Sequence, residues 1–379
     1  MRVLHVITGL AAGGAEHQLR LLLRHLPHEC EVATLANAGP VAQAIRAGGT
    51  PVHDLGMRGN RDVSVLPRLV RLIRDGRFDV VHTHLYRACL YGRLAARLAG
   101  VRQVLATEHS LGTGVIEGRP TTAGVRALYL AGERLGAGTI AVSGTVADRL
   151  VAWGVRRERV RVVPNGIDAT EFRYDRDTRA ATRAALGIPA GAQVVGSVGR
   201  LAATKRFDLL IGALAGLPPR TVLLLAGDGE QRAALASLAG QRGVADRVVF
   251  AGATAHAREV LCAMDVFASP SEQETFGLAV LEALANGLPA VYVTCPPLDE
   301  YPVAAPGTRR VAPDGRALRE ALRAELSGLA GRGGARLPVP DVLHRFDVPA
   351  LAARVGQIYH DVAAVRRPAA LRLIEGDAS

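Results

Sequence analysis

Two carboxylates lie on either side of a candidate anion site in this sequence. Glu274 and Glu282 are separated by seven residues, and Gly277 lies between them where an apolar helical pattern opens. Backbone N–H groups at a helix start favour an anion such as a phosphate. Carboxylates repel phosphate but accept hydrogen bonds from the adjacent hydroxyls of a sugar. This combination is what a nucleotide-sugar site needs.

The helix beside these acids is expected to begin near Phe276. The backbone N–H groups of Phe276, Gly277 and Leu278 would then be the unpaired donors. Gly277 lacks a side chain, so a ligand can approach the backbone closely there. Apolar runs at 265–268 and 290–294 predict a strand on each side, with one acid in the loop and the other in the first two turns.

One cation is set apart by composition. Of 46 basic residues, 45 are arginine, and Lys205 is the single lysine. A position that keeps lysine is expected to need a compact ammonium rather than a planar fork. Lys205 follows a predicted strand that ends at Gly199 and Arg200. The cations of Arg200 and Lys205 together suit a diphosphate. Plain surface charge is the alternative.

Strand and helix patterns alternate along the chain, which predicts an α/β protein with doubly wound parallel sheets. Its 379 residues exceed what one hydrophobic core usually serves, so we expect two domains. The predicted boundaries are 1–168 for the first domain, 169–191 for a linker with a short helix, and 192–347 for the second domain. A closing helix is expected at about 348–379.

A glycine loop, Gly9–Glu16, follows the first predicted strand, at the edge where open α/β sheets bind ligands. The spacing of Gly9, Gly13 and Gly14 does not fit a dinucleotide fingerprint, and the second strand does not end in an acid. A nicotinamide site is therefore not expected. A plain tight turn is the alternative to a ligand-binding loop.

The segment Ser271–Pro289 resembles the Glu-x7-Glu signature of retaining glycosyltransferases of family 4, which have the GT-B architecture. Val163–Asp168 resembles the family's Pro-Asn-Gly-(Val/Ile)-Asp element, and 194–208 resembles its Gly-Arg-Leu…Lys element. The resemblance implies two Rossmann-like domains facing each other across a cleft, with the closing helix crossing back onto the first. It covers 1–294 well and the rest in outline, because Cys295–Pro302 replaces the usual glycine-rich loop and Pro-Glu.

The resemblance also implies roles for individual residues. His109 would contact the transferred sugar, Glu274 would hold the sugar's hydroxyls, and Glu282 would hold the ribose. The predicted catalytic residues are His109, Arg200, Lys205 and Glu274; the donor-binding residues are Gly14, Gly199, Asp228, Gly229, Thr275, Phe276, Gly277, Leu278 and Glu282; the acceptor-side residues are Gly13, Glu16 and His84.

No metal or cofactor is expected. His82 and His84 lie on one predicted strand, where we expect them to face opposite sides or diverge, and adding His109 gives no acid or cysteine at ligand spacing. Asp175-Arg-Asp177 mimics the DxD motif of metal-dependent glycosyltransferases, but no strand precedes it. We interpret it as a surface helix start.

The formal charge of +11 is concentrated in the first part of the chain, which has 22 basic and 13 acidic residues through Asp168. Arg68, Arg71, Arg74 and Arg77 recur along one predicted helix. A solvated arginine face and a face for anionic lipid or a phosphate-bearing acceptor are both open. Nucleic acid is not expected, since no nucleic-acid-binding motif occurs.

The cytoplasm is the expected compartment, with peripheral contact at the inner membrane face left open. No apolar run approaches the ~20 residues of a membrane span, and the four cysteines form no CxxC.

The function we expect is a metal-independent, retaining glycosyltransferase that acts by a front-face mechanism. It would move a sugar from a nucleoside diphosphate to a glycan, a lipid-linked acceptor or a small molecule. A nucleotide-sugar 2-epimerase of GT-B fold and a non-catalytic nucleotide-sugar-binding module are the alternatives. A glycoside hydrolase also needs two carboxylates, but it would not need Arg200 or Lys205.

Overall fold

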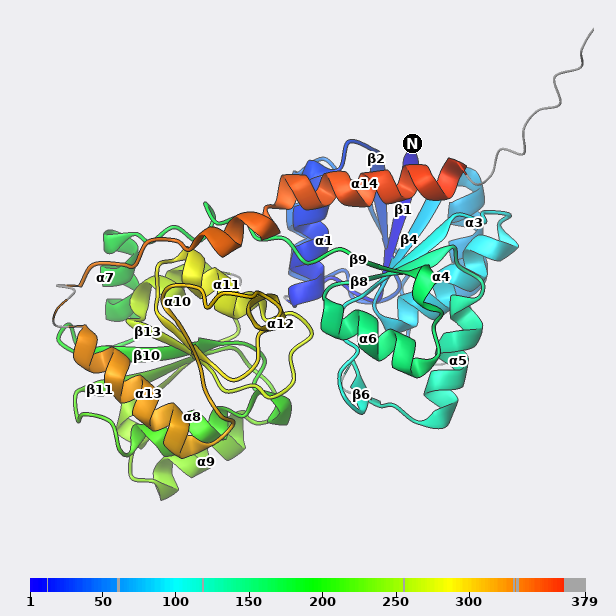
Figure 1. Ribbon diagram of the computed structural model, residues 1–379. Coiled ribbons are helices and arrows are strands. Elements are labelled where there is room, and N and C mark those ends of the chain that lie inside the picture. The colour runs from blue at the N-terminus through cyan, green and yellow to red at the C-terminus, as the bar shows by residue number, and fades with distance from the viewer. Residues whose placement is uncertain are drawn as a thin grey trace, which may run out of the picture.

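The computed structural model describes residues 1–11, 13–59, 62–117, 119–254, 256–329, 331 and 334–364. These residues form two lobes, each built on a parallel sheet with helices on its faces (Figure 1). The chain passes once from the first lobe to the second, and its last helix lies on the first lobe again.

Seven parallel strands make the first sheet. In spatial order they are β3 (Val52–Asp54), β2 (Glu29–Thr34), β1 (Arg2–Ile7), β4 (Val80–His84), β5 (Val104–Glu108), β8 (Gly138–Ala141) and β9 (Val160–Val162). Every residue of β4, β5 and β8 is buried, as expected for strands that helices cover on both faces. The order reverses direction beside β1, so ligands are expected at the carboxyl ends of β1 and β4.

The helices of the first lobe are α1 (Gly14–His25), α2 (Gly39–Ala47), α3 (Val65–Gly76), α4 (Tyr86–Leu98), α5 (Ala123–Glu133) and α6 (Gly144–Trp153). A short hairpin of β6 (Val115–Ile116) and β7 (Arg119–Pro120) precedes α5. Local sequence sets the ends of α6. The Ser143 hydroxyl accepts a hydrogen bond from the Val146 N–H, and Gly154 ends the helix at a φ of 106°.

The second sheet repeats the same topology with six parallel strands. In spatial order they are β12 (Val248–Gly252), β11 (Thr221–Ala226), β10 (Gln193–Val198), β13 (Val266–Ser269), β14 (Ala290–Tyr292) and β15 (Thr308–Arg310). Its helices are α8 (Phe207–Leu214), α9 (Arg232–Gln241), α10 (Ala257–Ala263), α11 (Leu278–Ala285), α12 (Pro296–Asp299) and α13 (Gly315–Gly328). Short 3-10 turns lie at Arg157–Arg159, Ala203–Lys205, Ala245–Arg247 and Asp341–Phe346.

Asp175 lies at the start of helix α7 (Arg176–Ala185), which follows β9 and precedes β10 in the sequence. Its carboxylate accepts a hydrogen bond from the Thr178 N–H at 2.6 Å, which caps the helix. The Asp-Arg-Asp sequence is therefore a helix start, as predicted.

The helix of the carboxylate signature begins two residues later than predicted. Gly277 is its N-cap, with a φ of 96°, and α11 starts at Leu278 rather than near Phe276. A left-handed backbone cannot continue into a right-handed helix, so the glycine fixes the boundary.

The last helix, α14 (Val348–Ala364), packs across the first sheet beside α1. Tyr359, 0% exposed, shares a core with residues of β1, β4, β5 and β8. Where the chain returns, the Ile167 N–H donates to the carbonyl of Phe346 at 2.7 Å, so the two crossings between lobes are joined. Residues 365–379 of the predicted closing helix lie outside the described part of the chain.

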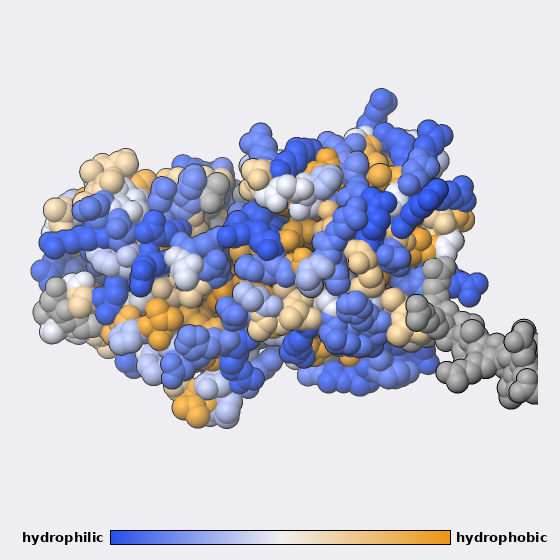
Figure 2. All heavy atoms as spheres, turned by 90° about the horizontal axis from the view of Figure 1, so that it is seen from above, coloured by the Kyte–Doolittle hydropathy of each residue, from blue (hydrophilic) through white to orange (hydrophobic). Residues whose placement is uncertain are grey.

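Hydrophilic residues cover most of the face that carries α14, and hydrophobic residues lie there in small groups (Figure 2). None of the described helices is long and apolar enough to cross a membrane.

Candidate active site

The predicted lysine and the first predicted carboxylate are in direct contact. The Lys205 ammonium lies 2.6 Å from an Oε atom of Glu274, across a separation of 69 residues. Lys205 ends the 3-10 turn that follows β10, and Glu274 belongs to the loop between β13 and α11. β10 and β13 are neighbouring strands, so their carboxyl ends place the two side chains together. The pair is partly open to solvent, with 31% and 12% of the two side chains exposed.

The predicted phosphate loop after β10 packs against the loop after β11. The Leu201 N–H donates to the carbonyl of Asp228 at 2.9 Å. A Cβ at Gly229 would lie 2.5 Å from the carbonyl oxygen of Leu201, so only glycine permits this approach. Arg200 is exposed between these loops, and its guanidinium has no hydrogen-bond or ion-pair partner among the described residues.

Backbone at the start of α11 is open to a ligand from one side only. A Cβ at Gly277 would lie 2.9 Å from the Cys295 sulfur, and the positive φ also favours glycine. The side chain of Phe276 is 3% exposed and packs edge-on against Phe346, with ring centroids 5.6 Å apart. Only the backbone of Phe276 can therefore face a donor.

The second carboxylate of the signature lies in a less polar environment than the first. Glu282 is on α11, and burial raises its pKa to about 7. Within the described residues its carboxylate has no hydrogen-bond or ion-pair partner, in contrast to Glu274. A desolvated, unpaired carboxylate of this kind can accept hydrogen bonds from a ligand's hydroxyls.

The glycine loop of the first lobe reaches the second lobe at α11. A Cβ at Gly14 would lie 3.3 Å from a methyl carbon of Leu278, so the starts of α1 and α11 meet. The Glu16 carboxylate lies over Gly13, and one of its oxygens is 2.4 Å from the position that a Cβ would take at Gly13. Burial raises the pKa of Glu16 to about 7, and the negative charge of Glu117 adds to the shift.

Three further contacts that the sequence did not predict join the lobes around this site. The Ser143 hydroxyl donates to the carbonyl of Thr275 at 2.7 Å. Arg149 of α6 donates to the carbonyls of Leu111, at 3.0 Å, and Glu274, at 3.5 Å. The loop that follows His109 therefore lies against the loop that carries Glu274.

The third of these contacts involves Glu300, which follows the unusual Cys-Pro-Pro segment. Its carboxylate accepts hydrogen bonds from the N–H groups of Gly144, at 3.3 Å, and Thr145, at 2.9 Å, at the start of α6 in the other lobe. A carboxylate at a helix N-terminus is favoured by the helix dipole. From sequence alone this segment departs from the family pattern, and Glu300 was only a candidate for the glutamate of the family's Pro-Glu.

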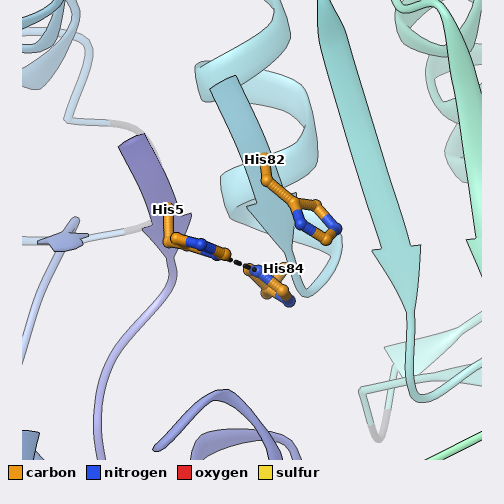
Figure 3. A group of neighbouring side chains, drawn as sticks. All are labelled: His5, His82 and His84. Carbon is orange, nitrogen blue, oxygen red and sulfur yellow. Dashed lines mark hydrogen bonds between the residues drawn. The ribbon is translucent and has the colours of Figure 1, made fainter. Parts of the chain in front are cut away.

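The structure corrects one expectation about histidines. His82 and His84 do not diverge, because residues two apart on a strand share a face; their ring centroids are 4.3 Å apart. His84, which was predicted on the acceptor side, is buried. Its side chain is 1% exposed, and one ring nitrogen contacts His5 at 3.1 Å (Figure 3). The other ring nitrogen contacts His109 at 3.2 Å.

His109 lies at the end of β5, where it was expected, and lines a cavity beside α14. The cavity has about 50 Å³ of room for the centres of water molecules and is lined mainly by apolar side chains, with His84, Thr107 and His109 among the polar ones. Burial lowers the pKa of His109 to about 4, and its Nδ1 has no hydrogen-bond partner in the described chain.

Within the described residues, one group of three potential metal ligands occurs, made by His5, His82 and His84. It is buried in the first sheet and contains neither Lys205 nor the signature acids. Both ring nitrogens of His82 already contact hydroxyls, Tyr359 at 2.6 Å and Thr107 at 2.7 Å. These contacts leave His82 poorly placed as a metal ligand.

Sequence comparison decides the family. The family described as Glycosyltransferase Family 4 matches residues 12–171, and the one described as Glycosyl transferases group 1 matches residues 178–324. The chain is 31% identical over 322 residues to the D-inositol 3-phosphate glycosyltransferase of Nocardia farcinica, covering 76% of this chain and 68% of that protein. The protein belongs to glycosyltransferase family 4.

Other glycosyltransferases are similar to this chain over a comparable length. The GDP-mannose-dependent alpha-mannosyltransferase of Mycobacterium tuberculosis is 32% identical over 322 residues, covering 81% of this chain and 77% of that protein. Among solved structures, Anabaena HepE in complex with UDP and glucose superposes with a TM-score of 0.83 at 20% identity, covering 95% of this chain and all of that one. The likeness to HepE shows the α/β GT-B fold, and the family makes this protein a glycosyltransferase.

Proposed function

We propose that this glycosyltransferase takes its sugar from a nucleoside diphosphate and transfers it with retention, without a metal ion. The observation that carries the proposal is the contact between Lys205 and Glu274 at the carboxyl ends of β10 and β13. It places a compact cation and a hydroxyl-binding carboxylate side by side, as the junction between a diphosphate and its sugar requires.

Three groups of the second lobe would hold the diphosphate. They are the Lys205 ammonium, the unpaired Arg200 guanidinium, and the backbone N–H groups at the start of α11. Each favours negative charge, and together they would stabilise the charge that develops on the leaving diphosphate. Fixed donors of this kind typically contribute a few kcal/mol each, which is the role that a divalent ion has in other transferases.

The two carboxylates would grip hydroxyls on either side of that charge. Glu274 would hold the transferred sugar and Glu282 the ribose diol, as the family resemblance implies. Partial desolvation of both carboxyls strengthens such hydrogen bonds. His109 would contact the transferred sugar from the first lobe.

In the reaction, the bond between the sugar's anomeric carbon and the diphosphate oxygen breaks. A new bond forms from that carbon to the acceptor hydroxyl on the same face. The hydroxyl's proton passes to the departing diphosphate oxygen, so no separate protein base is required.

The acceptor would enter from the first lobe, where Gly13 and Glu16 border the glycine loop. We propose that it is held at an anionic membrane surface. Arg71 and Arg74 of α3 are exposed, and Arg74 donates to the carbonyl of Leu98 at 2.8 Å. Leu94 and Leu98 of α4 are 40% and 50% exposed, so cations and apolar side chains lie side by side.

A donor screen tests the proposal. UDP, GDP, TDP and ADP sugars are compared for thermal stabilisation, since a ligand that binds the native state raises its stability. The stabilising donor is then incubated with candidate acceptors in the presence of EDTA, and the anomeric configuration of the product is read by NMR. We expect a retained configuration and full activity without metal, with Lys205→Met as the inactive comparison.

Three outcomes would contradict the proposal. Conversion of the donor to an epimer without any acceptor would indicate a 2-epimerase. Binding of a nucleotide sugar without turnover would indicate a binding module. Loss of activity in EDTA, restored by a divalent ion, would exclude the metal-independent course.

A further inference from the structure

A chain of three histidines runs from the core of the first lobe to the end of β5. His5 of β1 contacts His84 of β4 through Nδ1 and Nε2, at 3.1 Å (Figure 3). The Nδ1 atom of His84 in turn contacts the Nε2 atom of His109, at 3.2 Å. The chain thus connects a fully buried side chain to the predicted sugar-contacting histidine.

His82 lies beside this chain but is not a member of it. Figure 3 shows its ring alongside that of His84, turned away from the His5–His84 hydrogen bond. Its two nitrogens contact the hydroxyls of Tyr359 and Thr107 instead. This separate partnership makes His82 a local control for effects of burial alone.

Each of the three imidazole rings carries a hydrogen on one of its two nitrogens. Burial lowers the pKa of His5 to about 3 and that of His109 to about 4, and it holds the pKa of His84 well below its usual value. All three are therefore neutral near pH 7, and a neutral imidazole has one N–H and one acceptor nitrogen. The two hydrogen bonds then allow only two arrangements of the hydrogens.

In the first arrangement, His5 donates to His84, His84 donates to His109, and the free N–H is at Nδ1 of His109. In the second, His109 donates to His84, His84 donates to His5, and the free N–H is at Nε2 of His5. Neither end nitrogen has a partner among the described residues. Each arrangement thus leaves one N–H without a protein acceptor, at opposite ends of the chain.

The surroundings of the two ends decide between them. A buried N–H without an acceptor is costly and rare in proteins. His5 is 0% exposed, whereas His109 is partly exposed and lines the cavity beside α14. That cavity exceeds the 10–15 Å³ that one water centre needs. The Nδ1 atom of His109 and the Nε2 atom of His5 are both buried, but His109 borders this cavity, from which a water molecule or a ligand can approach as an acceptor, and His5 does not.

We propose that His5 and His84 are positioning residues that hold His109 in the tautomer with its hydrogen on Nδ1. His109 then presents an N–H donor, and on the proposed function its acceptor is an oxygen of the transferred sugar. A fixed tautomer matters because the other one can only accept a hydrogen bond at Nδ1, which would force the sugar hydroxyl to donate instead of accept.

NMR of the full chain labelled with ¹⁵N-histidine tests the tautomer directly, without any substrate. We expect His109 to show a protonated Nδ1 and a bare Nε2, with the signal assigned by its loss in His109→Gln. A protonated Nε2 at His109, or an even mixture of tautomers, overturns the proposal. Stoichiometric zinc in protein purified without chelator would also overturn it, since the histidines would then be ligands.

Variants separate positioning from simple packing. His84→Leu should lose the fixed tautomer and lower kcat roughly tenfold, with the KM for the donor nearly unchanged, as expected for one lost hydrogen bond. His84→Asn should recover most of that loss, because its amide N–H lies near the position of Nδ1. Equal losses in the leucine and asparagine variants contradict the inference.

Tyr359→Phe is the matched control. It removes a buried hydroxyl from the same core, but that hydroxyl contacts His82 and not the chain to His109. The tautomer of His109 should be unchanged in this variant, and a changed one contradicts the inference. If the NMR result is as expected but no sugar is transferred, the proposed function fails while the assignment of the tautomer stands.

Discussion

The ammonium of Lys205 and the carboxylate of Glu274 form a 2.6 Å ion pair. Each has a different ligand group to bind in the proposed reaction, a phosphate for the lysine and a sugar hydroxyl for the glutamate. The pair satisfies both charges until the donor binds. Because the two side chains are partly exposed, their ion pair is weak, and exchanging it for contacts with the donor costs little free energy.

Loss of the lysine charge should therefore affect turnover far more than stability. We expect Lys205→Met to lower kcat at least about a hundredfold, the typical effect of removing one charge-stabilising donor. Glu274→Ala should cause a loss of similar size. Arg206→Met is the control, because Arg206 pairs with Glu272 and Asp208 next to the same loop. Near-wild-type rates in both test variants, measured under saturating donor, would refute the assignment.

Nucleotide binding should release protons from Glu282. Its pKa of about 7 falls when ribose hydroxyls donate to the carboxylate, since hydrogen bonds to the charged form favour it. At pH 7 the free protein is about half protonated at this site, so roughly half a proton should leave. Calorimetry in buffers of different ionisation enthalpy measures this release. It should vanish in Glu282→Gln and persist in Glu16→Gln.

Glu108 should make a contribution to stability that falls as the pH rises from about 4.5 to 7. Glu108 is 1% exposed, and burial raises its pKa from 4.5 to about 7. In this window the unfolded chain ionises the carboxyl while the folded protein still binds the proton. Unfolding therefore becomes easier as the pH increases, by up to about 3 kcal/mol for this one group.

Urea unfolding at pH 5 and pH 7.5 measures the effect. Relative to the wild type, Glu108→Gln should gain free energy of unfolding between pH 5 and pH 7.5. Glu158→Gln, whose carboxyl is largely exposed, should behave as the wild type. An unchanged difference in Glu108→Gln would show that this residue is not responsible.

Substitution of Gly277 should impair both folding and donor binding. Gly277→Ala places a Cβ 2.9 Å from the Cys295 sulfur at a φ of 96°, at a cost of roughly 2 kcal/mol. Thermal unfolding and nucleotide titration report the two effects. Gly212→Ala, in the middle of α8 with nothing within 4 Å of the new Cβ, should be neutral or stabilising. Adding Cys295→Ala should recover only the part due to the clash.

Membrane attachment should depend on arginines of α3. Arg71→Gln with Arg74→Gln should weaken binding to anionic vesicles about 30-fold, since each arginine contributes about 1 kcal/mol near such a surface. Arg220→Gln with Arg242→Gln, exposed on the second lobe, removes equal charge and should have little effect. Equal losses in the two pairs, measured by vesicle co-sedimentation, would indicate a dependence on net charge alone.

Local pattern was enough to predict which elements of the second lobe carry Lys205, Glu274 and Glu282, because each lies within a few residues of a predicted strand or helix end. The structure places Lys205 and Glu274 in contact. The start of α11 was two residues off, since apolar periodicity does not show a left-handed glycine.

Contacts between segments far apart in sequence could not be predicted in this way. His5 and His84 are 79 residues apart, and their hydrogen bond depends on the register of β1 against β4. Glu300 and Thr145 are 155 residues apart and meet only because the lobes face each other. The expectation that His82 and His84 diverge was an error of a different kind, since the two-residue repeat of a strand contradicts it.

The bond from the Ile167 N–H to the Phe346 carbonyl has a mechanical consequence. The two segments that connect the lobes are hydrogen-bonded to each other at one point, so we expect the lobes to rotate relative to each other about that point. Residues there would set how far the lobes open without taking part in the chemistry, and α14, packed on the first sheet, would fix the position of this hinge.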